Sequence, residues 1–274
     1  MFKKNSEIIP QTLREQLPAG DTFAHIMGLR GEVFRDMPGR LTLNFKLGGQ
    51  SYFVKQHFGV GWREIFKNFL TLKLPIIGAK TEKLAIEKLN QIGIPTTPLV
   101  AFGEKGCNPA TKQSFVITQD LGDITSLETL CADWKNKPPP SRLKRRLIVA
   151  VGKIAQKLHD GGMNHRDFYL CHFCLDNVAL KHDEIKLYLI DLHRVGIAEK
   201  ISVSARMKDM AGLYFSAMDI GLTKRDYLRF LSVYRQQPLV NTLNNESGFW
   251  HKVSLRADEL YKKFQRKYAV RDLS

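Results

Sequence analysis

The sequence predicts an α+β protein of two lobes, a small antiparallel sheet with one key helix followed by a mainly helical part. Two observations support this fold class. Apolar residues alternate with polar ones around Gly48-Gly49, which is typical of paired strands, whereas from Ser141 onward they recur mostly at helical spacing. The pattern changes near Asp120. We therefore expect a first domain over residues 1–120 and a second over residues 121–274.

The composition is that of a folded globular protein with a strong positive charge. Of the 274 residues, 43% are hydrophobic and 25% are charged, which excludes a disordered or fibrous chain. The net charge of +15 favours anionic partners: nucleic acid, an acidic membrane surface, a polyphosphorylated substrate or an acidic protein. The alternative is that the excess of Lys and Arg only keeps the protein soluble, and charge alone does not decide between them.

Neither the cysteines nor the apolar segments indicate an exported or membrane-spanning protein. The four cysteines are too few and too unevenly spaced for a disulfide framework. Charged residues and a proline interrupt the most apolar segment, residues 66–79, whereas a membrane span needs about 18 to 20 apolar residues. The N-terminus lacks the apolar stretch of a signal peptide. We therefore expect a cytoplasmic protein.

The first lobe is predicted to contain five strands and one helix. Strands are expected just before Pro38-Gly39, on both sides of Gly48-Gly49, and over residues 98–102 and 114–119. Residues 79–92 have helical periodicity. Lys55 lies near the end of the second hairpin strand, and Glu82 lies on the apolar stripe of the helix, where an unpaired carboxylate is costly. We therefore expect Glu82 to pair with Lys55.

The second lobe is predicted to be mainly helical. Thr125 and Glu128 resemble a capping box before a short helix. Ser141 is placed to cap a long helix that ends at Gly161-Gly162. Four basic residues in its first turn either serve an outside anion or, as the simpler alternative, form a solvated face. The remaining predicted elements are a hairpin within residues 178–190 and helices over residues 203–218, 223–234 and 247–267.

The candidate catalytic residues follow one another in a characteristic order. His165-Arg166-Asp167 comes directly after the long helix, and Asp191 follows a strand. A lysine on a strand, a glutamate on the next helix, an H-R-D loop and an aspartate after a strand are the parts used for phosphoryl transfer. In this hypothesis Lys55 holds the nucleotide phosphates, Asp167 accepts a hydroxyl proton, Arg166 steadies the loop and Asp191 binds magnesium, which prefers oxygen ligands.

Five long segments carry a more specific resemblance. They are YFVKQHFGVGWREIFKNFLTLKLPIIGAKTEKLAIEKL at 52–89, IPTTPLVAFG at 94–103, NHRDFYLCHF at 164–173, LIDLHRV at 189–195 and RMKDMAGLYFSAM at 206–218. With them the chain resembles, over almost its full length, the lipopolysaccharide core heptose(I) kinase family of Gram-negative bacteria, within the protein-kinase-like superfamily. The resemblance implies a protein-kinase-like two-lobed fold and transfer of the γ-phosphoryl group of ATP to a hydroxyl, the 4-position in this family, of the first inner-core heptose. It maps the nucleotide lysine to Lys55, its partner to Glu82, the catalytic aspartate to Asp167 and the metal aspartate to Asp191.

The nucleotide-binding part departs from the protein-kinase pattern. The turn at residues 31–40 has no G-x-G-x-x-G motif. Arg35 and Arg40 occupy this turn and are candidates for phosphate binding, the alternative being simple surface charge. Gln119, at the end of the last strand before the expected domain boundary, completes the candidate nucleotide-binding set.

The metal-binding part departs from the pattern as well. His172 stands five positions after Asp167, where protein kinases place a metal-binding asparagine. Imidazole is a poor ligand for magnesium, so a second metal ion is in doubt and Asn177 is the alternative ligand. The triplet at Asp191 is D-L-H rather than D-F-G, so switching of the loop by a phenylalanine is not assumed. Asp209, on a later helix, is expected to hold the catalytic loop by accepting backbone hydrogen bonds.

Two local patterns have alternative interpretations. Cys171-His172-Phe173-Cys174 permits a zinc site, but no second ligand pair is spaced to match it, and burial as small apolar thiols explains the cysteines better. Trp62, Phe66, Phe69 and Leu70, with nearby basic residues, suit a membrane interface or, equally, the core of the first lobe.

The leading hypothesis is an ATP- and Mg²⁺-dependent kinase acting on an anionic glycolipid, the heptose-bearing inner core, at the inner face of the inner membrane. This substrate accounts for the basic surplus, makes peripheral membrane contact plausible and disfavours nucleic acid as a partner. About a dozen residues separate Asp191 from the next helix, which leaves little room for a peptide-docking segment. The alternatives are a pseudokinase-like scaffold that binds an acidic protein or other anionic partner, and a kinase for another sugar, a small molecule or tyrosine.

Overall fold

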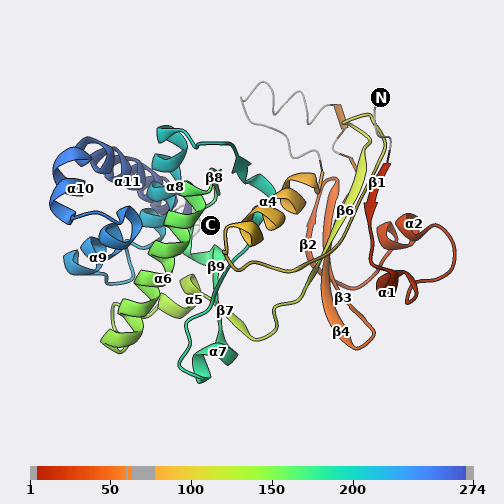
Figure 1. The fold of residues 1–274 in the computed structure, drawn as a ribbon, viewed down its shortest axis with the longest axis horizontal. Coiled ribbons are helices and arrows are strands. Elements are labelled where there is room, and N and C mark those ends of the chain that lie inside the picture. The colour runs from red at the N-terminus through yellow and green to blue at the C-terminus, as the bar shows by residue number, and fades with distance from the viewer. Residues whose placement is uncertain (1–4, 60, 63–77, 270–274) are drawn as a thin grey trace. The chain divides into compact units, whose positions relative to one another are not determined.

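The computed structural model describes residues 5–59, 61–62 and 78–269 (Figure 1). The chain forms two compact units. The N-terminal unit comprises Met1–Lys88, Thr97–Gly122 and Leu192–Arg194, and the C-terminal unit comprises Leu89–Thr96, Asp123–Asp191 and Val195–Ser274. Each unit thus also contains a short segment from the other side of Asp120.

The N-terminal unit is built on a six-stranded sheet in the order β1-β5-β6-β4-β3-β2, in which every neighbouring pair is antiparallel. Its strands are β1 (Asn5–Ile8), β2 (Glu32–Met37), β3 (Arg40–Leu47), β4 (Gln50–His57), β5 (Leu99–Lys105) and β6 (Gln113–Gln119). The five predicted strands are confirmed, including the β3–β4 hairpin around Gly48-Gly49. Strand β1 was not predicted.

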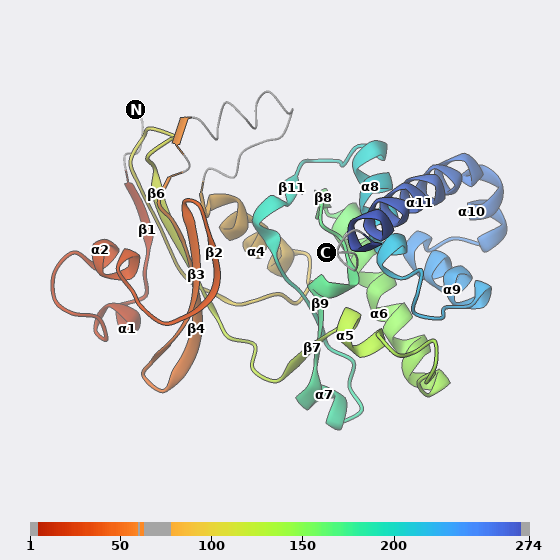
Figure 2. The same ribbon diagram turned by 180° about the vertical axis from the view of Figure 1, so that it is seen from behind.

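The two faces of this sheet pack against different helices. Leu43, Phe45 and Val54 point to an apolar core shared with Phe23 and Ile26. Phe23 and Ile26 come from α2 (Thr22–Met27), which together with α1 (Gln11–Arg14) covers this face and was not predicted. Because side chains alternate along a strand, the neighbours of these core residues face the opposite side. There lies the predicted helix, α4 (Lys80–Gln91), as the two opposite views in Figures 1 and 2 show.

The C-terminal unit is mainly helical, with α6 packed against α9 and α8 against α11. Its helices are α5 (Leu127–Cys131), α6 (Ser141–Asp160), α7 (Asn177–Lys181), α8 (Val203–Ser216), α9 (Lys224–Arg235), α10 (Leu239–Asn245) and α11 (Ser247–Ala269). Two small sheets complete it: β10-β9-β7, from Leu187–Leu189, Phe173–Asp176 and Ile124–Ser126, and β11-β8, from Gly196–Ile197 and Met163–Asn164. The long helix and the three later helices confirm the prediction, whereas α10 was not predicted.

Three local predictions in this unit are wrong in detail. Ser126, not Thr125, caps α5 by accepting a hydrogen bond from the Thr129 amide. Helix α6 begins at Ser141 itself, after Pro140, with no side-chain cap. The second hairpin pairs β10 with β9 instead of lying within 178–190, because the side chain of Asp176 caps residues 177–181 into the short helix α7.

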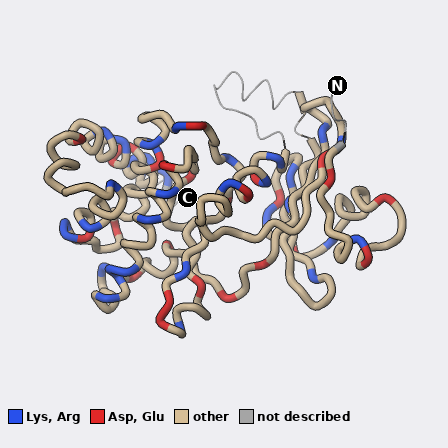
Figure 3. The backbone as a smooth tube through the Cα atoms, in the orientation of Figure 1, with Lys and Arg blue, Asp and Glu red and all other residues tan. Residues whose placement is uncertain are grey.

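The basic residues are spread over both units (Figure 3). Three of the four in the first turn of α6 have internal partners: Arg142 and Arg146 bind Asp183, and Lys144 lies 2.9 Å from Asp226. In the part of the chain that the structure describes, no helix is both long and apolar enough to cross a membrane.

Candidate active site

The N-terminal unit brings Lys55 and Glu82 together as predicted. The Lys55 Nζ atom lies 2.6 Å from Oε1 of Glu82. The side chain of Glu82 is only 4% exposed and that of Lys55 is 28% exposed, so the ion pair is partly shielded from water. Glu82 holds the ammonium group on the face of the sheet away from the α1 and α2 core, because Lys55 follows the core residue Val54 on β4.

Other basic residues lie on β2 and β3 of the sheet that carries Lys55. Arg35 pairs with Thr42 across the β2–β3 ladder, and Thr42 pairs with Lys55 across the β3–β4 ladder, so these residues form one row across the sheet. Arg40 pairs with His57 in the same way. Gln119 is the last residue of β6, and its backbone N–H donates a hydrogen bond to the carbonyl of Pro98. The two predicted arginines therefore lie on strands beside Lys55, while their phosphate contacts stay a prediction.

His57 is a residue of this region that sequence analysis missed. It lies two positions after Lys55 on β4 and is 5% exposed. Burial lowers its pKa to about 4, and the charges of Arg40 and Lys55 and the neighbouring His193 act in the same direction. Burial by itself disfavours a charge of either sign, so only the smaller contributions of Arg40 and Lys55 indicate surroundings that would attract an anion such as a phosphate group. The strand alternation that placed Lys55 also identifies His57, since residues two apart share a face.

The C-terminal unit holds the H-R-D loop in a strained conformation. Arg166 has a φ of 70°, in the left-handed region that non-glycine residues rarely occupy. Asp209 on α8 accepts hydrogen bonds from the amides of His165, at 2.6 Å, and Arg166, at 2.9 Å, which confirms the predicted anchor. His165 is fully buried and donates through Nε2 to the carbonyl of Ile190, and burial, followed by His172, lowers its pKa.

His172 joins the two candidate aspartates. Its Nδ1 atom lies 2.6 Å from the backbone carbonyl of Asp167, which accepts the hydrogen bond, so Nδ1 carries the proton. Its Nε2 atom lies 3.5 Å from Oδ2 of Asp191. Asp191 has a φ of 62°, a second left-handed residue beside the site. The structure thus brings the backbone of Asp167, the ring of His172 and the carboxylate of Asp191 into one group.

The donor set of this group fits a cation that brings further oxygen ligands with it. The Nε2 atom of His172 faces the carboxylate of Asp191, so a cation bound to that carboxylate would lie beside the ring. Among the described residues no cluster of three or more His, Cys, Asp or Glu side chains could hold a metal by itself. Magnesium in phosphoryl-transfer enzymes takes one or two protein ligands together with phosphate oxygens.

The structure does not bring Asn177 to this group. Its side-chain amide donates to Asp123 and Thr125, at 2.7 and 2.9 Å. It follows β9, whereas His172 precedes that strand, so roughly 16 Å of extended chain separates the two.

The zinc interpretation finds no support among the described residues. Cys131 and Cys174 are buried, and burial raises the pKa of Cys174 to about 11. Cys171 is half-buried, its pKa raised to about 11 by burial, and Cys107 is exposed. Buried thiols of this kind favour the neutral form and act as small apolar groups.

Known proteins of one family are similar to this chain. The sequence profile of the lipopolysaccharide kinase (Kdo/WaaP) family matches residues 24–234. The chain belongs to this family. The lipopolysaccharide core heptose(I) kinase WaaP of Escherichia coli (strain K12) is 46% identical over 248 residues, which cover 90% of this chain and 94% of that protein. The WaaP of Pseudomonas aeruginosa is 44% identical over 247 residues, covering 90% and 92%.

A solved structure of the same family confirms the predicted fold class. It is described as WaaP in complex with acyl carrier protein, is 37% identical to this chain, and superposes with a TM-score of 0.81 over 93% of this chain and 99% of its own. The predicted kinase-like α+β fold and the predicted family are therefore both confirmed.

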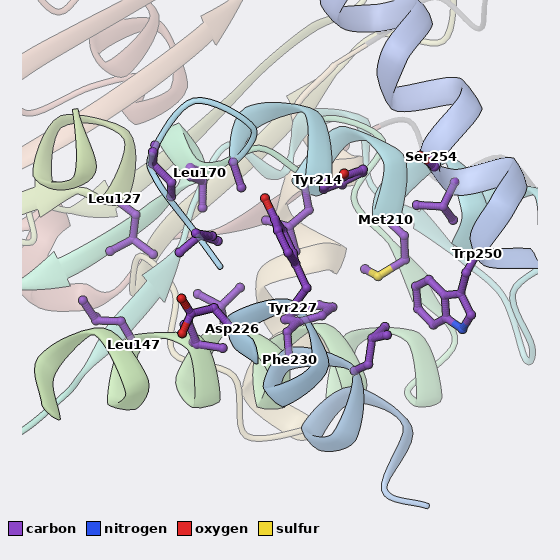
Figure 4. A pocket seen from close by; sticks show the side chains of 18 of the residues that line it. Leu127, Leu147, Leu170, Met210, Tyr214, Asp226, Tyr227, Phe230, Trp250 and Ser254 are labelled. Atoms are coloured by element: carbon purple, nitrogen blue, oxygen red, sulfur yellow. The ribbon is translucent and has the colours of Figure 1, made fainter. Parts of the chain in front are cut away.

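This member of the Kdo/WaaP family also contains an apolar cavity in its C-terminal unit. The cavity has a volume of about 330 Å³ and lies among α6, α8, α9 and α11 (Figure 4). Leu147, Met210, Phe230 and Trp250 contribute to its apolar wall. The sequence does not predict this cavity, because apolar residues at helical spacing predict a packed core whether or not the packing leaves space.

One carboxylate, that of Asp226, stands in the wall of this cavity. It accepts hydrogen bonds from the amide and hydroxyl of Thr223, completing a capping box on α9, and pairs with Lys144 at 2.9 Å. Burial raises its pKa, but the hydrogen bonds from Thr223 and Lys144 outweigh burial and leave the pKa lowered. Asp226 is therefore a charged but fully satisfied group, and the rest of the cavity remains apolar.

Proposed function

We propose that the protein is an ATP-dependent kinase that phosphorylates the first heptose of the lipopolysaccharide inner core, at the 4-hydroxyl. The supporting observation is that a chain 46% identical to a heptose(I) kinase contains the charged residues that phosphoryl transfer requires. Lys55 pairs with Glu82, and the backbone of Asp167 lies beside Asp191 through His172. The identity of the acceptor is inferred from the relatives, and the type of reaction is inferred from these charged residues.

Each group has one task in the proposed reaction. Lys55, fixed by Glu82, binds phosphate oxygens of ATP. Asp167 accepts a hydrogen bond from the heptose hydroxyl and takes its proton as the oxygen attacks the γ-phosphorus atom. The new bond joins that oxygen to phosphorus, the bond from phosphorus to the β,γ-bridging oxygen breaks, and ADP leaves with the electron pair. The strained loop at Arg166 presents Asp167 in a fixed direction, which is how positioning contributes to such reactions.

The activity test compares Asp167→Asn with a matched control, Glu184→Gln, at an exposed carboxylate outside the site. With purified protein, ATP, Mg²⁺ and unphosphorylated heptose-bearing core, we expect Asp167→Asn to lower kcat by roughly 10²- to 10⁴-fold and the control to retain it. Mass spectrometry and NMR of the product locate the phosphate. Asp167→Asn with more than half of the wild-type kcat would refute the assignment of the base, and ATP binding without transfer to any acceptor would favour the scaffold alternative.

We also propose that Mg²⁺ is the cofactor and that Asp191 is its carboxylate ligand, with His172 beside it. When bound, the ion neutralises developing charge on the phosphate oxygens. Because the protein supplies few ligands, binding should depend on the nucleotide. Calorimetric titration of Mg²⁺ with and without a non-hydrolysable ATP analogue measures this, and equal affinity in both titrations would contradict the proposal.

An acyl carrier protein is the second partner that we propose. The solved relative is a complex with that protein, and two features of this chain suit such a partner: a net charge of +15, which favours an acidic protein, and the apolar cavity, which fits an acyl chain. Ala217, in the cavity wall, offers the test. Ala217→Phe should weaken binding of acyl-loaded carrier but not of unloaded carrier, and equal binding of the loaded form by both proteins would exclude the cavity as the acyl site.

We place the enzyme at the inner face of the inner membrane, because its proposed acceptor is a glycolipid and its charge favours an anionic surface. The predicted interfacial segment lies largely outside the described residues, which include only Trp62 of the four apolar residues proposed for it. Co-sedimentation with anionic vesicles in low and high salt tests this placement, and absence of binding in low salt would refute it.

A further inference from the structure

Three buried polar side chains from three helices form a hydrogen-bonded link that ends at the catalytic loop. Tyr234 on α9 lies with its hydroxyl 2.7 Å from Nδ1 of His159 on α6. The Nε2 atom of His159 lies 3.3 Å from Oδ2 of Asp209 on α8. The side chains of His159 and Asp209 are 3% and 1% exposed, and Tyr234 is 3% exposed.

The proton positions in this link follow from the Asp209 carboxylate at its end. Three N–H groups converge on Asp209, from His159 and from the amides of His165 and Arg166, and a carboxylate accepts all of them. His159 therefore carries its proton on Nε2, and its Nδ1 atom accepts the hydrogen bond from the Tyr234 hydroxyl. Burial raises the pKa of Tyr234, which keeps that hydroxyl protonated and able to donate. Every polar atom of the link thus has a partner.

The link bears on the loop because Asp209 holds the strained residue. Arg166 keeps its left-handed backbone while Oδ1 of Asp209 accepts its amide, and Asp167 is the next residue. Such a conformation is energetically unfavourable for a residue with a side chain and persists only where surrounding contacts enforce it. His159 binds Oδ2, the oxygen that also accepts the His165 amide, and so adds a third hydrogen bond that restrains the rotation of the carboxylate about its side-chain bond. A carboxylate free to rotate would hold the two amides less firmly.

We propose that His159 and Tyr234 are positioning residues of the catalytic loop, acting through Asp209 to hold Asp167 in its working direction. The proposal deepens the kinase function proposed above and rests on it. Neither residue touches the reacting atoms. A buried polar chain of this kind is not needed for packing, since apolar side chains of the same shape would fill the space at lower cost.

The same link lies against the apolar cavity. The ring of Tyr234 stacks on Phe230 at a centroid distance of 5.8 Å and meets Trp250 edge to face at 6.0 Å. Phe230 and Trp250 both line the cavity, and so does Met210, the residue after Asp209 (Figure 4). Residues of the cavity wall therefore contact Tyr234 at one end of the link and adjoin Asp209 at the other.

The test uses Tyr234→Phe, which removes only the hydroxyl, and His159→Leu, which removes both hydrogen bonds. His159→Gln is the conservative variant, because its amide can still donate to Asp209. Tyr261→Phe is the matched control: its hydroxyl also binds an aspartate, Asp219 at 3.0 Å, but it lies on α11 away from the link. For each variant, kcat, KM for ATP and thermal stability are measured.

We expect kcat to fall about tenfold in Tyr234→Phe and about 100-fold in His159→Leu, with KM for ATP within twofold of wild type, and His159→Gln to recover most of the loss. Hydrogen exchange at the His165 and Arg166 amides should accelerate in the same order. That readout needs no acceptor, so a wrong acceptor assignment and a wrong positioning assignment give different results. Unchanged exchange at both amides in His159→Leu, or a kcat loss in Tyr234→Phe no larger than in Tyr261→Phe, would overturn the proposal.

Discussion

Breaking the Lys55–Glu82 pair should destabilise the N-terminal unit unequally, depending on which partner is removed. In Lys55→Met the apolar stem remains, but the carboxylate of Glu82 stays in a site that is only 4% exposed and loses its cation. In Glu82→Gln the ammonium group of Lys55, whose side chain is 28% exposed, can turn toward water. An uncompensated buried charge costs far more than a polar group that reaches solvent.

The expected magnitudes follow from these exposures. Removing one partner of a buried ion pair destabilises by about 3 to 5 kcal/mol, and we expect Lys55→Met at the lower end, about 3 kcal/mol, because the pair is partly open to water. Glu82→Gln should cost about 1 kcal/mol. The double variant Lys55→Met/Glu82→Met removes both charges and should return to within about 1 kcal/mol of wild type.

Amide hydrogen exchange in β4 and β6 is the suitable assay, because it reports on the N-terminal unit alone while urea unfolding averages over two compact units. Urea unfolding followed by circular dichroism gives the global comparison. Kinase activity should fall in all three variants, so activity does not distinguish them, whereas stability does. A Lys55→Met variant no less stable than Glu82→Gln would refute the inference that Glu82 is the desolvated partner.

Two further predictions concern single residues. The pKa of His57 is lowered from 6.5 to about 4, so the folded state takes up a proton less readily than the unfolded state. The free energy of unfolding should therefore decrease by about 3 kcal/mol as the pH falls from 6.5 to 4. Urea unfolding at several pH values should show a shallower decrease in His57→Gln than in the wild type, and equal slopes would contradict this. Gly162→Ala should destabilise by at least about 2 kcal/mol, because Gly162 has a φ of 76° and a Cβ there would lie 2.0 Å from the carbonyl oxygen of Ala198. Gly122→Ala is the control, because Gly122 has a φ of 73° but no atom within 4 Å of an added Cβ, and it should cost only about 1 kcal/mol. Equal losses of stability in urea unfolding would show that backbone strain, and not the close approach to Ala198, causes the destabilisation.

The sequence alone predicted those elements whose residues carry a regular local pattern. The alternation around Gly48-Gly49 placed Lys55 on a strand, and the helical spacing of residues 79–92 placed Glu82 on a buried stripe. Their pairing then followed from the cost of burying an isolated carboxylate, and the structure confirms it. Where the local pattern was ambiguous the prediction failed: residues 177–181 form a helix because the side chain of Asp176 caps them, a contact that short apolar runs do not reveal.

The sequence by itself thus determined the order of the elements and the identity of the charged residues, because periodicity and the cost of buried charge act over a few turns of chain. Only the tertiary structure decided that His172 stands between Asp167 and Asp191, that His57 is buried among positive charges, and that His159 and Tyr234 meet across 75 positions of sequence. It also decided that four helices with ordinary core patterns leave an apolar cavity between them. These features depend on how distant elements pack, and a spacing rule within one element contains no information about the side chains that face it from another.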